Sequence, residues 1–249
     1  MTQPIKAMIL AAGRGERMRP LTDDCPKPLL KVRGKALIDW HVEALGRGGV
    51  REVVINTAWL GDQISSHLGL LRMLDGREQL SFSYSTEGDD FGYALETAGG
   101  IARALPLLGE AFWLLASDVF VPRFAFSPEA VSRFLAGDKL AHLWLVPNPP
   151  HNPQGDFGLG ADGLALNLPL NPPAGDPAPR YTYSTIGLFR RELFDTLPFG
   201  NTPGLAVALA PLLRTAMDHR QVSAELYTGA WTDVGTPSRL TELNQTISN

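Results

Sequence analysis

A glycine-rich loop with three arginines follows the first apolar run of the chain and is the segment best suited to binding phosphate. The apolar run over residues 7–12 leads into Gly13-Arg14-Gly15-Glu16-Arg17-Met18-Arg19. Glycines let the backbone turn tightly and bring its N–H groups close to phosphate oxygens, and arginines add positive charge. Met18 stands where a dinucleotide-binding loop needs its third glycine, and no Gly-Lys-Ser/Thr follows as in a P-loop. On these residues alone, an ordinary tight turn between a strand and a helix explains the loop equally well.

Three further charged residues have both a chemical and a structural interpretation. Asp118 follows a buried apolar run, and Asp233 lies in a turn before Gly235. Each is either a ligand for a hard divalent cation or a residue that caps a turn. Lys27, between two prolines, is either a phosphate-binding group or a solvated surface lysine. The five histidines are scattered without the spacing of a metal site, and no Ser-His-Asp or Cys-His arrangement points to nucleophilic catalysis.

The composition is that of an ordinary globular enzyme. Of the 249 residues, 44% are hydrophobic and 19% are charged, and the formal net charge is −4. General attraction to nucleic acid or to an anionic membrane is therefore not expected. The single cysteine, Cys25, excludes an internal disulfide framework. The N-terminal apolar run is too short for a signal peptide or a membrane span, so we expect a cytoplasmic protein.

Short apolar runs alternate with stretches of helical spacing up to about residue 146, which predicts an α/β fold with a doubly wound sheet. Buried strands are expected at residues 7–12, 53–56, 112–115 and 143–146, with a half-exposed strand at 80–85. Helices are expected at residues 37–45, 64–68 and 101–105.

The character of the chain changes after Val146. Prolines and asparagines over residues 148–153 and 168–179 predict loops and short β-elements. Beyond them we expect a strand at 181–189, a helix at 203–217, a short strand at the turn around Asp233, and a last helix that begins at Pro237.

Taken with the residues that follow it, the glycine loop resembles the signature of the sugar-1-phosphate nucleotidyltransferases. An Ala-Ala-Gly strand end, Gly-x-Gly-x-x-Arg, Pro20-Leu21-Thr22 and Pro26-Lys27-Pro28 stand at the family's offsets within twenty residues. The resemblance covers most of the chain, since it continues at residues 95–100, at Ser117-Asp118-Val119, at Gly155-Asp156-Phe157 and at residues 231–236.

The resemblance implies a single domain over residues 1–249 with a Rossmann-like, doubly wound mixed sheet of the GT-A-like nucleotidyltransferase type. Residues 1–146 are then the nucleotide-binding part. Residues 147–249 form a small β-rich sugar-binding part and the C-terminal helix.

The implied reaction is in-line attack of a sugar-phosphate oxygen on the α-phosphorus of a nucleoside triphosphate, with pyrophosphate leaving. Both reactants are anions, so positioning and electrostatic stabilisation carry most of the catalysis. Mg²⁺ is the implied cofactor, held by Asp118 and Asp233, because it prefers one or two carboxylates together with phosphate oxygens and water. Arg17 is expected to steady the pyrophosphate, and Lys27 to bridge the α-phosphate and the sugar phosphate.

The resemblance also implies where the substrates bind. The residues expected at the nucleotide are Leu10, Ala11, Ala12, Gly13, Arg14, Gly15, Glu87 and Thr97. Asp156, Ser184 and Gly187 are expected to face the sugar. The implied partners are these two small molecules, without nucleic acid or membrane, and the chain is expected to act as a monomer or a small homo-oligomer.

The resemblance favours transfer of UMP from UTP to N-acetylmuramic acid 1-phosphate, a step in cell-wall recycling. A guanylyl- or cytidylyltransferase for a mannose or heptose phosphate is the alternative within enzymes. A catalytically silent nucleotide-sugar sensor on the same fold is an alternative of another class.

Three features depart from the family pattern. Ala116-Ser117 precede the expected metal aspartate where near relatives carry Asn-Gly, which bears on the choice of sugar. An apparent insertion at residues 89–93 is expected to reshape the base or sugar pocket. The proline-rich stretch over residues 169–179 is longer than the fold needs and is expected to form a lid or an oligomer contact.

Overall fold

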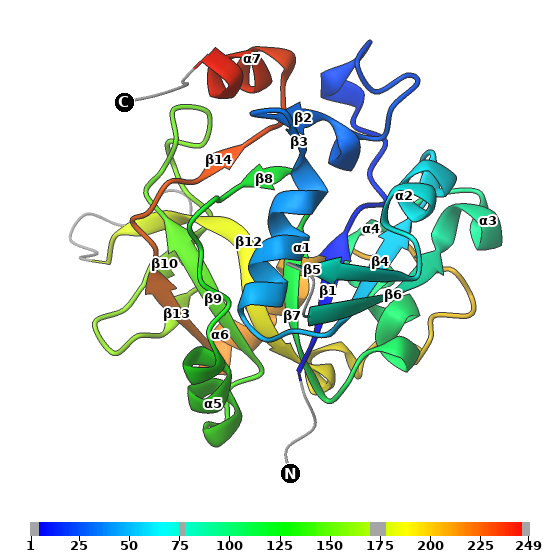
Figure 1. Ribbon diagram of the computed structural model, residues 1–249. Helices are drawn as coiled ribbons and strands as arrows, with labels where there is room; N and C mark the ends of the chain where they lie inside the picture. Colours follow the sequence, from blue (N-terminus) through cyan, green and yellow to red (C-terminus); the bar gives the residue numbers. More distant parts are fainter. Residues whose placement is uncertain (1–4, 75–77, 170–177, 246–249) are drawn as a thin grey trace.

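The structure is a computed structural model that describes residues 5–74, 78–169 and 178–245. Within these residues, ten strands form one mixed sheet with helices on both faces (Figure 1). The strands of this sheet are β1 (Lys6–Leu10), β4 (Glu52–Thr57), β5 (Leu71–Leu74), β6 (Glu78–Thr86), β7 (Ala111–Ala116), β9 (Ala141–Val146), β10 (Phe157–Leu159), β11 (Ala165–Leu166), β12 (Arg180–Arg190) and β13 (Val222–Leu226). Four of them, β1, β4, β7 and β9, confirm the buried strands expected from the sequence.

The sheet runs in the order β5, β6, β4, β1, β7, β12, β9 and β13, and β10 and β11 extend it beside the first residues of β12. Strands β6, β4, β1 and β7 are mutually parallel, whereas β12 is antiparallel to both β7 and β9. The carboxyl ends of β6, β4, β1 and β7 therefore meet at one edge of the sheet. A functional site is expected at this edge in a sheet of this kind.

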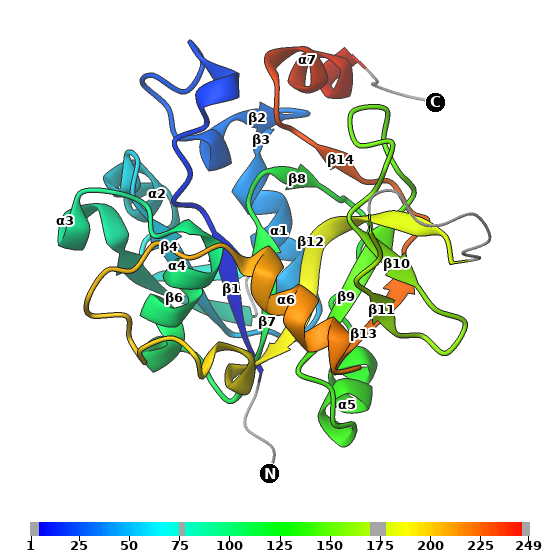
Figure 2. The same cartoon turned by 180° about the vertical axis from the view of Figure 1, so that it is seen from behind.

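Two layers of helices cover the sheet. The helices are α1 (Leu37–Arg47), α2 (Gly61–Leu68), α3 (Glu87–Phe91), α4 (Glu96–Ala104), α5 (Pro128–Ala136), α6 (Leu209–Asp218) and α7 (Pro237–Gln245). Val42 of α1, Ile64 of α2 and Phe134 of α5 belong to one buried cluster. Ile101 of α4 and Leu213 of α6 belong to a second cluster on the opposite face (Figure 2). The doubly wound α/β fold is confirmed.

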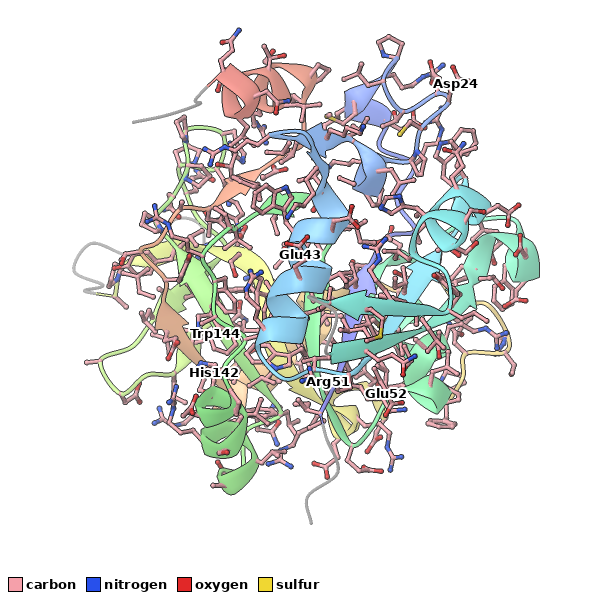
Figure 3. All side chains as sticks on the ribbon, viewed as in Figure 1. Asp24, Glu43, Arg51, Glu52, His142 and Trp144 are labelled. Carbon is pink, nitrogen blue, oxygen red and sulfur yellow. The ribbon has the colours of Figure 1, made fainter. Side chains whose placement is uncertain are left out.

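Strand β1 shows why the apolar runs lack alternation. Ala7 and Ile9 pack in the first cluster, whereas Met8 packs in the second, and all three side chains are fully buried. A strand covered by helices on both faces needs apolar residues at successive positions. Farther along the sheet, Trp144 of β9 lies next to His142 (Figure 3). Trp144 also packs against Trp113 of β7, with ring centroids 5.0 Å apart.

A third, smaller cluster lies beyond the carboxyl edge of the sheet. It joins Met18 of the glycine loop, Phe120 of strand β8 (Val119–Phe120), Val234 after strand β14 (Thr232–Asp233), and Leu240 of α7. Strand β14 pairs antiparallel with β8. A short hairpin, β2 (Lys31–Val32) with β3 (Lys35–Ala36), adds Val32 to the cluster. The apolar contacts thus fix the C-terminal helix against the glycine loop.

One expected helix begins later than the sequence indicated. The helix expected at residues 203–217 is α6, which begins at Leu209, so the prediction is wrong over residues 203–208. The backbone there is engaged elsewhere: Val207 N–H donates to the Leu95 carbonyl oxygen, and the Val207 carbonyl accepts from Ala98 and Gly99. A residue that caps the first turn of α4 in this way cannot also lie in a helix of its own.

Two features singled out in the sequence are placed as follows. The insertion over residues 89–93 forms the end of the short helix α3 and the turn after it, and a side-chain carbon on Gly204 would contact the Phe91 ring. Of the proline-rich stretch 169–179, residues 170–177 lie outside the described residues. In the part of the chain that the structure describes, each helix is too short or too polar to cross a bilayer.

Candidate active site

A cavity of about 400 Å³ opens at the carboxyl ends of β1, β4 and β7. Most residues that the sequence predicted for the nucleotide and the chemistry line it. They are Leu10, Ala11, Ala12, Gly13, Gly15, Arg17, Lys27, Glu87, Thr97 and Asp118. Ala116 and Ser117, which depart from the family pattern, also lie in the cavity wall.

Lys27 is a buried residue of this cavity. It opens a single 3₁₀ turn, Lys27–Leu29, and only 10% of its side chain is exposed. Its Nζ lies 2.7 Å from Oδ2 of Asp118. A lysine with so little exposure needs a partner for its charge, so the interpretation as a solvated surface lysine is wrong.

Arg17 lines the cavity and is exposed to solvent. Within the described residues it forms no ion pair, although it lies between Arg14 and Arg19, which do. Both neighbours bind Asp23: Arg14 Nη2 and Arg19 Nε lie 2.9 Å and 2.8 Å from its Oδ1. The hydrogen bond from Arg14 lowers the pKa of the Asp23 carboxyl below its usual value. Arg17 is therefore the arginine of the loop that is available to an anionic ligand.

Arg14 is held in the scaffold of the loop and does not line the cavity. Its guanidinium lies 3.8 Å above the ring of Trp59 and donates to the Thr22 carbonyl oxygen at 2.8 Å. Trp59 Nε1 donates to the same carbonyl at 3.0 Å. The direct contact between Arg14 and a nucleotide stays a prediction. Trp59, in the loop between β4 and α2, was missed; its signal was an aromatic residue just beyond the end of a predicted strand.

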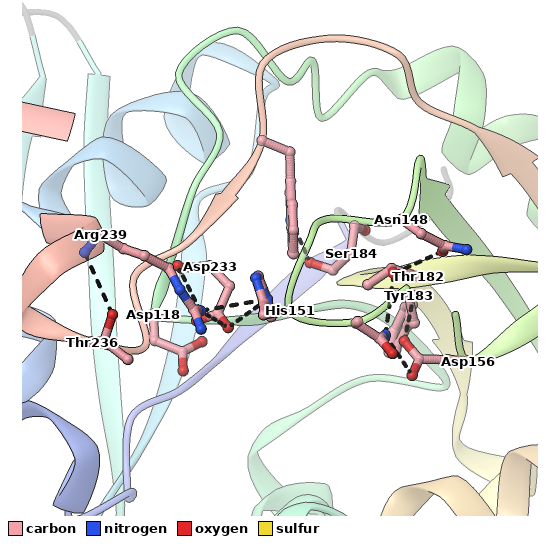
Figure 4. Close-up of polar contacts among 12 residues, drawn as sticks. Asp118, Asn148, His151, Asp156, Thr182, Tyr183, Ser184, Asp233, Thr236 and Arg239 are labelled. Carbon is pink, nitrogen blue, oxygen red and sulfur yellow. Dashed lines mark hydrogen bonds and ion pairs between the residues drawn. The ribbon is translucent and has the colours of Figure 1, made fainter. Parts of the chain in front are cut away.

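Asp118 lies in the turn between β7 and β8, next to strand β14, which carries Asp233. Asp233 pairs with Val119 in the β8–β14 ladder, and the Val234 N–H donates to the Asp118 carbonyl oxygen at 2.8 Å. Oδ2 of Asp233 lies 2.6 Å from Arg239 Nη1 and 3.3 Å from His151 Nε2 (Figure 4). Asp118 and Asp233 thus lie on adjacent segments, and each carboxylate is paired with a cationic side chain.

The donor set fits a divalent cation with oxygen ligands. Asp118 lines the cavity and 36% of its side chain is exposed, and Asp233 follows on the next strand. Within the described ranges, no three or more His, Cys, Asp or Glu side chains group as a metal site. Mg²⁺ usually binds one or two carboxylates, and phosphate oxygens and water fill its remaining coordination positions.

Glu87 joins three segments at the far side of the cavity. The carboxylate is fully buried and accepts from Asn56 Nδ2 at 2.6 Å and from the Leu95 N–H at 2.7 Å. Asn56 Oδ1 in turn accepts from the Ala11 N–H at 2.8 Å. Burial raises the pKa of Glu87 above its usual value. Asn56 was missed as a site residue, although its place at the end of a predicted buried strand was the signal that could have found it.

The three residues expected at the sugar are not among those that line the cavity. Asp156 Oδ2 accepts from the Tyr183 N–H at 2.8 Å (Figure 4). Ser184 Oγ accepts from the Ile186 N–H at 3.1 Å. Gly187 lies within β12, where a side-chain carbon would come within 2.7 Å of the Phe189 ring. All three shape an irregular part of β12, and their contact with a sugar stays a prediction.

The chain is similar to known proteins over nearly its whole length. Residues 6–249 match the family model described as nucleotidyl transferase. The chain is 47% identical over 240 residues to N-acetylmuramate alpha-1-phosphate uridylyltransferase of Neisseria meningitidis serogroup B, with 96% of each chain covered. It is 31% identical to the enzyme of the same name from Caulobacter vibrioides, covering 94% of this chain and 93% of the relative.

A solved structure supports the fold alone. A Bacillus anthracis protein proposed to be a glucose-1-phosphate thymidylyltransferase, crystallised with sucrose, superposes with a TM-score of 0.73 at 21% identity. The match covers 98% of this chain and 96% of the other.

Proposed function

The chain belongs to the nucleotidyl transferase family, and its named relatives transfer a nucleotide to a sugar 1-phosphate. We propose that the substrates of this chain are UTP and N-acetylmuramic acid 1-phosphate. UMP passes to the sugar phosphate and pyrophosphate leaves, with Mg²⁺ as cofactor. The observation that carries the proposal is the buried Lys27–Asp118 pair in the cavity wall, beside the glycine loop and next to the strand of Asp233.

The residues of the chain have distinct parts in this reaction. Lys27 is held at the cavity wall between the glycine loop and Asp118, where its ammonium can contact the α-phosphate and the incoming sugar phosphate. Arg17 contributes a free guanidinium at the end of the cavity formed by the glycine loop, which suits the leaving pyrophosphate. A bound Mg²⁺ would supply further positive charge between Asp118 and Asp233.

The glycine loop and the Glu87 network suit the nucleotide. The backbone over residues 10–13 borders the cavity, and Glu87, Asn56 and Thr97 lie there too. Since Asn56 and Glu87 hold each other and the backbone at Ala11 and Leu95, they fix the shape of this wall before the nucleotide binds. A preformed site loses less conformational entropy on binding.

The choice of UTP and of N-acetylmuramic acid 1-phosphate is supported by the two named relatives. With these substrates the protein acts in cytoplasmic recycling of cell-wall sugars, as a monomer or a small homo-oligomer. Ala116 and Ser117 line the cavity, and we expect them to influence which sugar the site accepts.

The test is pyrophosphate release with Mg²⁺, using UTP, GTP, CTP and dTTP against a panel of sugar 1-phosphates. Release only with UTP and N-acetylmuramic acid 1-phosphate is the expected result. Release with GTP or CTP and another sugar would keep the reaction and replace both substrates. Absence of release with every pair would leave the silent sensor as the better interpretation.

A further inference from the structure

Arg239, which no part of the sequence analysis singled out, lies against the carboxylate of Asp233. Its Nη1 is 2.6 Å from Asp233 Oδ2 and 3.4 Å from His151 Nε2. The guanidinium and the carboxylate are both well covered, with 19% and 20% of their side chains exposed. Figure 4 shows the three side chains converging from α7, β14 and the loop after β9.

This cluster reaches the wall of the cavity at Gly235. A side-chain carbon on Gly235 would lie 2.7 Å from Asp233 Oδ1 and 3.1 Å from Arg239 Nη1, and Gly235 itself lines the cavity. The helix that carries Arg239 is anchored, because Leu240 packs against Met18 in the third apolar cluster. The guanidinium is therefore held beside the cavity by the fold.

An Arg-Asp-His cluster by itself does not make a site, and the chain contains a second one that shows this. Arg72 Nη1 lies 2.6 Å from Asp39 Oδ1, and His67 Nε2 lies 3.0 Å from the same oxygen. That cluster joins α1, α2 and β5, and neither its residues nor their chain neighbours line the cavity, whereas Gly235, two residues beyond Asp233, does. The Arg239 cluster differs because a second cation–carboxylate pair, Lys27 with Asp118, lies beside β14, where the Val234 N–H donates to the Asp118 carbonyl oxygen.

We propose that Arg239 is a substrate-binding residue that neutralises Asp233 in the free protein. Once a divalent cation engages Asp233, Arg239 binds the phosphate of the sugar 1-phosphate. This assignment rests on the proposed function. The physical reason is competition between positive charges, because the guanidinium of Arg239 already neutralises the Asp233 carboxylate and repels a cation that approaches it. The guanidinium released beside an incoming phosphate is a group well matched to it.

The position of His151 favours the sugar phosphate over the pyrophosphate. His151 belongs to the loop between β9 and β10, within the part of the chain expected to hold the sugar. Arg239 contacts this loop, whereas Arg17 serves the end of the cavity at the glycine loop. Arg239 and Arg17 thus lie on different segments, which suits Arg239 to the sugar phosphate and Arg17 to the pyrophosphate.

The first test measures the affinity of the free protein for Mn²⁺ alone, by electron paramagnetic resonance of the unbound ion. Arg239→Gln is expected to tighten Mn²⁺ binding by about tenfold, because it removes a charged hydrogen bond that competes for Asp233. The matched control, Arg72→Gln, breaks the same kind of cluster away from the cavity and should leave the affinity unchanged. Unchanged or weaker Mn²⁺ binding in Arg239→Gln would show that Arg239 only orients Asp233, and would overturn the proposal.

The second test separates the substrates in steady-state kinetics. Arg239→Gln should raise the KM for the sugar 1-phosphate by about tenfold or more and leave the KM for the triphosphate nearly unchanged. Arg239→Lys, which keeps the charge, should recover part of the loss and replaces the Gln variant if that variant does not fold. A rise in the KM for the triphosphate alone would overturn the assignment to the sugar phosphate. If the wild type turns over no substrate pair, the proposed function fails, while the Mn²⁺ measurement still decides whether Arg239 competes for Asp233.

Discussion

The ammonium of Lys27 and the carboxylate of Asp118 lie 2.7 Å apart, although 91 residues separate them in the chain. The pair joins the segment after the glycine loop to the end of β7, two elements that border the same cavity. It also places a cation and a candidate metal ligand in direct contact. Removing Lys27 should therefore affect chemistry more than stability, because the Asp118 carboxylate left behind is partly exposed.

Lys27→Met should lower kcat/KM by about a thousandfold, the magnitude typical of removing a group that stabilises the transition state electrostatically. Asp118 keeps some exposure, so the carboxylate left behind remains solvated and the protein should stay folded. The measurement is pyrophosphate release, with circular dichroism to check the fold. Lys35→Met, which breaks the ion pair with Glu43 outside the cavity, is the control. A rate close to that of the wild type would remove Lys27 from the mechanism.

Chelation by EDTA should stop the reaction, and added Mg²⁺ should restore it, because two anionic substrates must meet beside two carboxylates. Asp118→Asn should not regain activity at any Mg²⁺ concentration, since the amide is a poor ligand for a hard cation. Asp39→Asn, in the cluster on α1, should respond to Mg²⁺ like the wild type. Full turnover in EDTA would contradict the metal assignment.

Trp59→Leu should raise the KM for the triphosphate by about fivefold with little change in kcat, because it removes a cation–π contact and loosens the glycine loop. The tryptophan supports Arg14 and also donates to Thr22, so the loop loses two contacts at once. Trp59→Phe keeps an aromatic ring, so its KM for the triphosphate should lie between those of the wild type and of Trp59→Leu. An unchanged KM would mean that the loop keeps its shape without this support.

Stability should depend on pH through His41. Complete burial lowers its pKa to about 4, from an ordinary value of 6.5. Between these values the unfolded chain binds more protons, so the free energy of unfolding is highest above pH 6.5 and falls as pH drops towards 4. From pH 7 to pH 5 the loss from this residue is about 2 kcal/mol.

The measurement is denaturant unfolding at several pH values for the wild type and for His41→Leu. The difference between the two should shrink or reverse as pH falls, because the variant lacks this titration. Parallel curves for the two proteins would show that His41 is not the responsible group.

Gly187→Ala should destabilise the fold by about 2 kcal/mol through overpacking. The added carbon would lie 2.7 Å from the Phe189 ring and 2.9 Å from the His142 carbonyl oxygen. Gly137→Ala, whose carbon meets nothing closer than 3.6 Å, is the control. Thermal unfolding together with the KM for the sugar decides the role of Gly187. A variant that is as stable as the wild type but has a raised KM for the sugar 1-phosphate would support the prediction that Gly187 contacts the sugar.

Much of the fold could be predicted because its strands are buried on both faces. In β1 and β7 nearly every position is apolar, and β4 has the apolar run Val53-Val54-Ile55 at its centre, so the run itself marks the strand. The start of α6 could not be predicted, because residues 203–208 have helical spacing but bind α4 through Val207. A tertiary hydrogen bond there overrides a local pattern.

The candidate site divides in the same way. Lys27 and Asp118 stand in a resemblance with fixed offsets, and the structure brings them together. Arg239 has no such signal, and Trp59 has only that of an aromatic residue beyond a predicted strand, since each contacts a segment distant in the chain. The sugar residues were placed by resemblance alone, and their side chains or backbone are used within β12.

The central place of β12 has a consequence for how the protein is made. β12 covers one edge of β7 and also pairs with β9, yet it begins at Arg180, well after both strands have left the ribosome. Until it emerges, the growing chain presents β7 as an unprotected edge, which is the kind of surface that recruits other chains. A chain truncated after residue 146 should therefore aggregate, and the two parts of the protein should be inherited, expressed and engineered together.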